Sequence, residues 1–450
     1  MRIRWWYFVL FVLLVVLTAY IIRYKIPPSY HNAIPKKADA IVQIKLRNIE
    51  RHVVFDAITH PAKYISSKSG KKKSKRLRKL SKAIKIPKIL FFYMAEELLK
   101  NAWFSNVLPL DNAQMLIEFL NDEKFEVVEH DDYKIFNKRN FYIVLKEDNY
   151  ILTYADNPID DVNVFNAIFN PENYLDEDSS RLKVLKDNSA DAIFLQPDGN
   201  ILTVDFMEGK LQISGKLNKL SEYFEESSDA IPAKADNIAY FSAKIKNNKW
   251  VGNWAYLDTI KQKIEDFSHL KLDSVTPRLS GGVSSVFSSV KKLKDTVVTY
   301  DYDDDFNQVE TKKVVEHTIP VFNLELGKKD TADTVFKYLN RHNALLIEEK
   351  DTIFTKIPLF PVKLDDNNNS ITFFTDKYNV AEENNPHKLA AYFNLKNYKT
   401  QQIKEFSIPE NNFTSSFHYF NCIIALSDEV LIEFVFNDKN RNVLGQLINP

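Results

Sequence analysis

The sequence predicts an α+β fold: an N-terminal transmembrane helix followed by two related α+β repeats with antiparallel sheets. Two observations carry this prediction. The octapeptide Ile34–Ile41 returns as Ile231–Ile238 with six of eight positions identical and a spacing of 231 − 34 = 197 residues. An uncharged apolar run also occupies the extreme N-terminus, from Trp5 to Ile22. Units of about 200 residues are ordinary domains.

The apolar run Trp5–Ile22 predicts an uncleaved signal-anchor. At about 1.5 Å per residue it just spans a hydrocarbon core, and Trp and Tyr residues stand at both edges. A cleaved signal peptide is the alternative, but no small-x-small cleavage site follows. Arg2 and Arg4 favour a cytoplasmic tail of residues 1–4. The expected localisation is therefore the cytoplasmic membrane, as a single-pass protein with the bulk of the chain periplasmic.

The two repeats are expected at residues 34–228 and 229–450, after a linker over residues 23–33. Each octapeptide leads into a strand, ending at Leu46 or Ile245. Each repeat then has a helix with Asp at its N-cap, Asp111–Asn121 or Asp330–Asn340. Strand-like stretches follow each helix: Phe125–Phe136, Phe141–Tyr154, Ala344–Thr355 and Pro361–Thr375. Polar turns are expected at Asn137–Asn140 and Asp365–Ser370.

The second repeat contains extra residues. Its helix ends 340 − 121 = 219 residues after the first helix, 22 more than the 197 of the octapeptides. The segment from Val297 to Val321 reads as strand, turn and strand, so an inserted hairpin is expected there. Just before it, Leu279–Ser289 is small and polar and predicts a mobile loop.

The composition argues against a nucleotide-dependent enzyme. Nine glycines in 450 residues leave few phosphate-binding loops, and the Gly-rich nucleotide motifs are missing. The formal net charge is zero, so no global field indicates a partner. The single cysteine, Cys422, lies in an apolar run and predicts a buried strand position instead of a nucleophile. No cofactor is expected.

A basic run from Lys68 to Lys85 contains ten Lys or Arg residues and no acid. It predicts contact with a polyanion such as anionic lipid or a glycan. Nucleic acid is not expected because interleaved aromatic residues are missing. The alternative is a solvated run, or one paired with the acidic stretch from Asp156 to Ser180. The candidate polyanion-binding residues are Lys71, Lys72, Lys73, Lys75, Arg76, Arg78, Lys79 and Lys82.

Other candidates receive a structural interpretation. The acidic stretch Asp301–Asp305 lacks the glycine and distal glutamate of an EF-hand, and it is read as a turn. His52 and His60, on an expected helix from Ile49 to Thr59, are read as structural or surface residues. Trp250 and Trp254 are expected to pack in a core.

Short motifs give the chain a resemblance. Ile34–Asp39 and Ile231–Asp236 share the pattern Ile-Pro-x-x-Ala-Asp, and Leu324–Asp330 reads Leu-Glu-Leu-Gly-x-x-Asp. In these motifs the chain resembles a loosely defined group of uncharacterised bacterial envelope proteins with an N-terminal membrane anchor. The resemblance implies an exported, membrane-tethered protein, and it implies no catalytic residues.

Together these observations predict a non-enzymatic, membrane-anchored envelope protein, a two-repeat binding or scaffold module for a protein, lipid or glycan. Two alternatives stay open. One is an electrostatic tether through Lys68–Lys85. The other is an enzyme whose site is assembled from distant residues, recognisable as carboxylates or histidines that converge in one pocket with perturbed pKa values.

Overall fold

The computed structural model describes most of the chain between residues 30 and 448. The gaps within that span are residues 31, 66–78, 131, 160–162, 228–230, 233–236, 247–260, 264, 267, 303–305, 307, 331–332, 350, 358–359, 377–381, 384–385 and 402–411. The described residues form two compact units. Unit 1 comprises the chain up to Lys216 together with Asp438–Pro450, and unit 2 comprises Leu217–Asn437. The C-terminal residues thus belong to the same unit as the first half of the chain.

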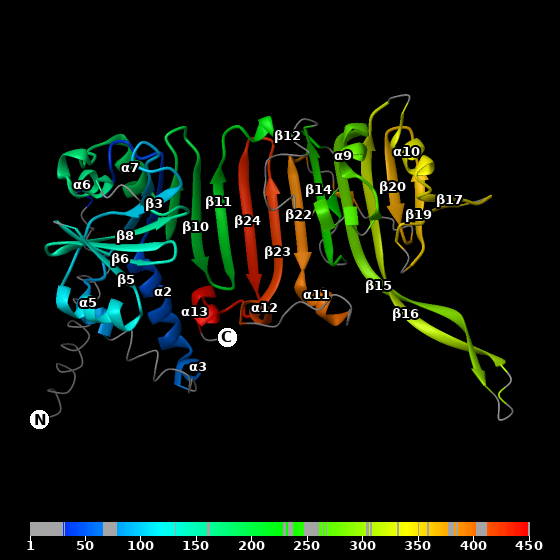
Figure 1. The fold of residues 1–450 in the computed structure, drawn as a ribbon, viewed down its shortest axis with the longest axis horizontal. Helices are drawn as coiled ribbons and strands as arrows, with labels where there is room; N and C mark the ends of the chain where they lie inside the picture. Colours follow the sequence, from blue (N-terminus) through cyan, green and yellow to red (C-terminus); the bar gives the residue numbers. More distant parts are fainter. Residues whose placement is uncertain are drawn as a thin grey trace, which may run out of the picture. The chain divides into compact units, whose positions relative to one another are not determined.

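Unit 1 is built on an antiparallel sheet whose neighbouring strands pair in the order β5-β6-β7-β8-β3-β2-β1-β9-β10-β11 (Figure 1). The short β4 (Leu108–Pro109) also pairs with β8. In chain order the other strands are β1 (Ala40–Ile44), β2 (Leu90–Met94), β3 (Ala102–Ser105), β5 (Glu126–His130), β6 (Tyr133–Lys138), β7 (Phe141–Lys146), β8 (Asn149–Ala155), β9 (Ala192–Leu195), β10 (Ile201–Met207) and β11 (Lys210–Lys216).

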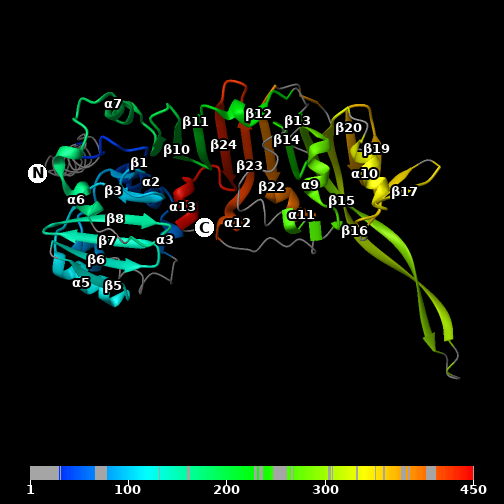
Figure 2. The same ribbon diagram turned by 45° about the horizontal axis from the view of Figure 1, so that its top comes forward.

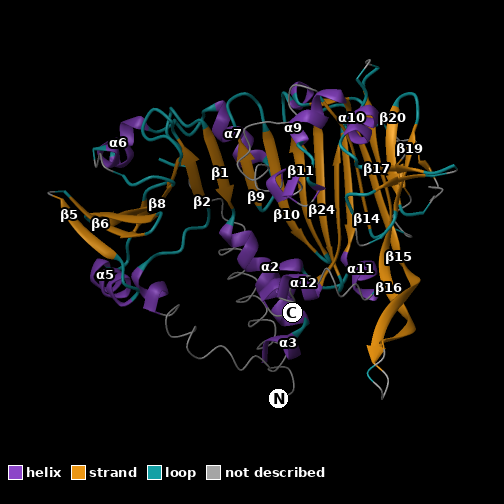
Figure 3. Cartoon of the chain, turned by 45° about the vertical axis from the view of Figure 1, so that its right-hand side comes forward, coloured by secondary structure: helices purple, strands orange, loops and turns teal. Residues whose placement is uncertain are grey.

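The helices of unit 1 include α2 (Leu46–Thr59), α3 (Pro61–Ile65), α5 (Ala113–Asp122), α6 (Val164–Phe169), α7 (Ser180–Asp187) and α13 (Val443–Ile448). One residue separates β1 from α2 (Figure 3), and α2 contacts the C-terminal α13. Two apolar clusters form the core. One lies on the β1–β3 part of the sheet around Ile41, Tyr93 and Phe104, and the other lies under α5 around Leu116 and Leu120.

Unit 2 has its own antiparallel sheet, paired in the order β17-β18-β19-β20-β16-β15-β14-β22-β23-β24. Its strands are β14 (Ala239–Ile245), β15 (Leu279–Tyr302), β16 (Gln308–Lys328), β17 (Leu345–Ile347), β18 (Thr352–Phe354), β19 (Val362–Asp366), β20 (Ser370–Phe374), β22 (Leu389–Asn394), β23 (Phe417–Ile424) and β24 (Glu429–Phe436). The short β12 (Phe224–Glu225) pairs with β14, and β13 (Ile231–Pro232) pairs with β21 (Glu382–Glu383).

The helices of unit 2 include α9 (Leu272–Val275), α10 (Val335–Arg341), α11 (Leu395–Thr400) and α12 (Asn412–Ser416). Its largest apolar cluster joins α10 to strands β18 to β20 through Val335, Leu339 and Val362. Figure 2 shows α10 beside the strands of this cluster and the long β15–β16 hairpin projecting from the same sheet. A smaller cluster includes the stacked rings of Tyr240 and Tyr392.

The two sheets have the same order of strands. In unit 1 the first strand, β1, lies between β2 and β9. In unit 2 the first long strand, β14, lies between β15 and β22. Continuing outward on both sides, each position of one order has a counterpart in the other, and α5 and α10 occupy equivalent places before β5 and β17. The connectivity of the described strands is therefore shared by the two units.

The predicted fold class is wrong. The described residues form mainly large antiparallel sheet, not an α+β fold behind an N-terminal transmembrane helix. The sheet extends through segments that were expected to be single strands or loops. Phe125–Phe136 folds as the hairpin β5–β6, and Leu279–Ser289, expected as a loop, is the first half of β15. The helices are short by comparison, as the seven residues of α10 illustrate.

The predicted localisation is also not supported. Trp5–Ile22 lies outside the described residues, and no helix within the described part is long and apolar enough to cross a membrane. The longest helix described, α2, has 14 residues. That corresponds to about 21 Å, against about 30 Å for a hydrocarbon core. The prediction of a single-pass protein of the cytoplasmic membrane, with the bulk of the chain periplasmic, is therefore not supported by the described structure.

Of the local predictions, the turns and the hairpin are confirmed and the helix starts are wrong. The turns at Asn137–Asn140 and Asp365–Ser370 are confirmed, because Lys138 pairs with Phe141 and Asp366 with Ile371. The hairpin between Val297 and Val321 is present as β15–β16 and is longer than predicted. Both helix starts were placed too early. Asn112 caps α5 through Met115 N, and Thr334 caps α10 through Lys337 N, since these side chains reach the exposed first-turn amides.

Candidate functional site

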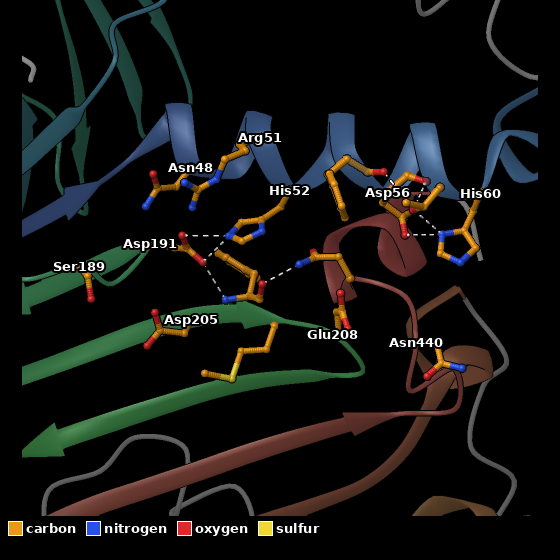
Figure 4. A pocket seen from close by; sticks show the side chains of 15 residues that line it. Asn48, Arg51, His52, Asp56, His60, Ser189, Asp191, Asp205, Glu208 and Asn440 are labelled. Carbon is orange, nitrogen blue, oxygen red and sulfur yellow. Dashed lines mark hydrogen bonds and ion pairs between the residues drawn. The ribbon is translucent and has the colours of Figure 1, made fainter. Parts of the chain in front are cut away.

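A cleft of about 720 Å³ lies beside α2 in unit 1. One wall is a single face of α2, a second comes from Asp191 and the end of β10, and the third comes from Asn440 and Asn442 near the C-terminus. Figure 4 shows these side chains converging on one space. All of them belong to unit 1.

The spacing of residues on α2 places four polar side chains along the cleft. Asn48, His52, Asp56 and His60 follow one another at intervals of four, which sets them on one helix face. No Gly or Pro interrupts Leu46–Thr59, and Pro61 comes just after the helix end. Phe55 lies on the same face and lines the cleft with 62% of its surface exposed, whereas Ile58, 70% exposed, does not line it.

His52 and Asp191 form the central pair of the cleft. His52 Nε2 lies 3.2 Å from Asp191 Oδ1, and Phe206 N donates to Asp191 Oδ2 at 2.9 Å (Figure 4). Burial alone would raise the pKa of the Asp191 carboxyl, but the hydrogen bonds from His52 and Phe206 outweigh it and lower the pKa. Asp191 is therefore held as a carboxylate, fixing His52 and β10 together.

Asp205 has the opposite character. It lies on β10 and lines the same cleft. Burial first, and then the nearby Asp191 carboxylate, raise the pKa of its carboxyl. Two carboxyls with pKa values shifted in opposite directions thus share one cleft. Carboxyls that converge in one pocket with perturbed pKa values are expected of a site assembled from distant residues.

A buried ion pair closes the far end of the cleft. Arg441 donates from Nη2 to Asp56 Oδ2 at 3.0 Å, and their side chains are 3% and 0% exposed. Tyr64 also donates to Asp56, at 2.9 Å, and His60 Nδ1 lies 3.3 Å from its Oδ1. Burial would raise the pKa of Asp56, but the Arg441 and Tyr64 hydrogen bonds lower it. Burial, and then the hydrogen bond to the Asp56 carboxylate, raise the pKa of Tyr64 to about 12.

The C-terminal segment fits tightly against this pair. An added Cβ at Gly445 of α13 would stand 1.9 Å from Asp56 Oδ2. Asn442 Nδ2 donates to Phe206 O at 2.7 Å, and Gly209 N donates to Arg441 O at 2.7 Å. Residues 438–448 therefore complete the cleft, because they tie α2 to the β10–β11 hairpin.

The predicted polyanion-binding residues lie elsewhere. Lys71, Lys72, Lys73, Lys75, Arg76 and Arg78 fall outside the described residues. Lys79 Nζ lies 2.5 Å from Asp122 of α5, and Lys82 is exposed on the following turn. Leu80 and Ile84 of the same stretch pack against the core under α5. Polyanion binding by this run stays a prediction.

The remaining sequence candidates have structural roles or fall outside the described part. Trp250, Trp254 and Asp303 to Asp305 lie outside it. Cys422 lies on β23, and burial raises the pKa of its thiol to about 11, which keeps it protonated at neutral pH. No group of His, Cys, Asp or Glu within the part the structure describes could hold a metal ion.

Sequence reasoning named two members of the cleft, His52 and His60, without finding the site. It missed Asp191 and Arg441, which lie 139 and 385 residues from their partners on α2. The one local signal was the interval of four from Asn48 to His60, which marks a polar helix face.

Comparisons with known proteins give no family. No family model and no curated protein matches the chain. Solved structures that match include crystal forms of TP0453, a Treponema protein. Form I has a TM-score of 0.23 at 6% identity and covers 78% of this chain and 93% of that one. Form IV has a TM-score of 0.28 at 5% identity, with coverages of 44% and 84%. Likenesses this weak do not establish a shared fold.

Proposed function

We propose that the protein is a non-enzymatic binding module and that the cleft beside α2 binds a polyhydroxylated ligand such as a glycan. The observation that carries the proposal is the composition of the cleft. Carboxylates and amide groups line it together with Arg51 and the exposed ring of Phe55. Hydroxyl groups both donate and accept, so they suit a lining that offers both roles. Concave sites with an apolar surface and a few fixed polar groups are typical of small-molecule binding.

The charges of the cleft favour a neutral ligand. Asp56 is neutralised by Arg441, and Asp191 is paired with His52. Asp205, Glu208 and Arg51 also line the cleft, which leaves a weakly acidic lining that would repel anionic groups.

Calorimetric titration of the full chain with a panel of neutral, acidic and basic oligosaccharides tests the proposal. Neutral sugars should bind, and Phe55→Ala should weaken that binding about tenfold, since an aromatic face is lost from the cleft. Ile58→Ala is the matched control, because Ile58 is similarly exposed on the same helix but does not line the cleft. Equal affinities for both variants and the unchanged chain would disprove the assignment.

An acid–base hydrolase is the second candidate, and Asp205 is the observation that favours it. A carboxyl whose pKa is raised beside an ionised carboxylate can serve as a general acid. Incubating the protein with a bound sugar and following its products separates the two candidates. A binding module releases the sugar intact. Turnover that disappears in Asp205→Asn, while binding persists, would establish the hydrolase instead.

A further inference from the structure

The β15–β16 hairpin extends far beyond the sheet of unit 2. β15 pairs with β14 from Gly282 to Phe287, and β16 pairs with β20 from Asn323 to Gly327. Beyond those positions the two strands pair with each other as far as Tyr302 and Gln308. We call residues 292–302 and 308–318 the ribbon. Figures 1 and 2 show it projecting away from the other strands of its unit.

The ribbon leaves a long strand edge uncovered. Among the described residues, no strand pairs with the outer edge of β16 between Gln308 and Ile319, whereas Thr375 hydrogen-bonds to the backbone of Pro320 and Phe322. Such an edge presents backbone N–H and C=O groups that can pair with another chain. Apolar side chains are also exposed on the ribbon, with Val314 at 62% and Tyr300 at 63%. A two-stranded ribbon without cover is marginal in water and gains from additional strands.

The sequence of this edge complements itself. Consider two copies of β16 that pair antiparallel about a two-fold axis at Val314. Each residue then faces the residue of the other copy whose number brings the sum to 628 (314 + 314). Val314 then faces Val314 of the second copy, and Lys312 faces Glu316 in both directions. These three residues alternate along the strand, so they lie on one face, and all three are exposed. Opposite charges placed directly across two strands stabilise the pairing.

The other edge of the ribbon lacks this complementarity. If two copies of β15 paired about an axis at Val298, facing residues would add to 596 (298 + 298). Asp295 would then face Asp301, two like charges. An axis at Val297 would set Leu293 against Asp301 (297 + 297 = 594). Neither arrangement sets a lysine of the ribbon directly opposite an acid of the ribbon. The charges therefore select the β16 edge.

We infer that the outer edge of β16 docks a second copy of this chain, as a symmetric antiparallel pair centred on Val314. The two ribbons together form a four-stranded sheet. Glu316 already lies 3.4 Å and 3.5 Å from Lys292 and Lys294 of its own ribbon. In the pair it gains Lys312 of the second copy as a further neighbour. Within the ribbon this register pairs residues 310–318 of each copy, nine residues. One strand edge of that length is a small contact compared with stable interfaces, which bury about 1,200–2,000 Å², so the dimer forms reversibly.

A charge swap tests the inference. Sedimentation of the full chain should show a dimer that dissociates on dilution. Lys312→Glu and Glu316→Lys should each weaken it at least about tenfold, because each sets two pairs of like charges opposite one another. The double variant, and an equimolar mixture of the two single variants, should restore association. Glu310→Lys is the control, since position 310 faces Thr318. A monomer at every concentration, or single variants that associate like the unchanged chain, would overturn the inference.

Crosslinking checks the position of the axis. In a Cys422→Ser background, Val314→Cys should form a disulfide between two copies, because a residue on the axis faces itself within about 5.5 Å. Glu310→Cys should not, since its counterpart would be 318. Circular dichroism identifies any variant that fails to fold. A dimer that crosslinks equally from both positions would contradict the symmetric pairing.

Discussion

Units 1 and 2 share an order of strands, but they differ in what the sheets carry. Unit 1 sets a polar helix and the C-terminal segment beside its strands and forms a cleft of about 720 Å³. A cleft in unit 2, lined by residues of β14 to β16, measures about 270 Å³. Unit 2 instead lengthens two strands into the β15–β16 hairpin. The comparison teaches that strand order does not determine function, which depends on the side chains placed on it.

Single positions make the difference concrete. With the 197-residue spacing of the octapeptides, Lys45 corresponds to Ser242 (242 − 45 = 197). Lys45 N donates to Asp191 O, whereas Ser242 pairs with Ala390. Asp191, whose carboxylate holds His52 in unit 1, therefore corresponds to the buried Ala390 in unit 2. A binding cleft of the unit 1 kind is not expected at that place in unit 2.

The largest contrast is expected from the buried ion pairs. Arg441→Ala leaves Asp56 charged and without its buried partner, and it should cost about 3–5 kcal/mol of unfolding free energy. In unit 2, Lys388→Ala leaves Asp428, which is 18% exposed and reaches water, so the cost should be about 1.5–3 kcal/mol. Hydrogen exchange with mass spectrometry assigns each loss to its unit. Equal losses would remove the contrast.

Two glycines give the next contrast. Gly445→Ala drives a Cβ into the Asp56 carboxylate and should cost about 1–3 kcal/mol despite the better helix propensity of alanine. Gly282→Ala of β15 meets its nearest atom at 3.8 Å, in ordinary contact, and should change stability by less than about 0.5 kcal/mol. Denaturant unfolding of both variants measures the difference. A neutral Gly445→Ala would show that α13 does not press on Asp56.

Acid should loosen unit 1 through its two buried carboxylates. The folded pKa values of Asp56 and Asp191 are lowered, so each contributes stability that is present above about pH 4 and is lost as pH falls through the folded pKa. Asp205 has a raised pKa, so its contribution is present at low pH and declines as pH rises. Urea midpoints between pH 3 and 7 should therefore vary less for Asp191→Asn than for the unchanged chain. Asp187→Asn, at an exposed position of the same unit, is the control.

The smallest contrast concerns helix caps. Asn112→Ala and Thr334→Ala each remove the side chain that caps α5 or α10, at a cost of about 1 kcal/mol. The Asn112 bond is the shorter, 2.9 Å against 3.3 Å, so its loss should be the larger of the two. The thermal unfolding midpoints of the two variants show which loss of stability is larger. A larger loss at Thr334 would reverse the expected ranking.

Local chemistry in the sequence predicted local features and little beyond them. Turn residues located the Asn137–Asn140 and Asp365–Ser370 turns and the β15–β16 hairpin, because turn preference is a property of a few neighbouring residues. The extent of the sheet was missed because Leu279–Ser289, rich in Ser and Gly, forms a strand through pairing on both sides. The cleft was missed because Asp191 and Arg441 meet α2 only after the chain has folded.

Methionine methyl NMR tests the central claim, that the cleft of unit 1 is the binding site. The chain has four methionines, and Met207 lines the cleft with 41% of its surface exposed. Met94 and Met115 belong to the same unit but do not line it, so they are internal controls. On titration with a neutral oligosaccharide the Met207 resonance should shift saturably while those of Met94 and Met115 stay in place. A Met207 resonance that does not move when calorimetry records binding would place the ligand elsewhere and contradict the account.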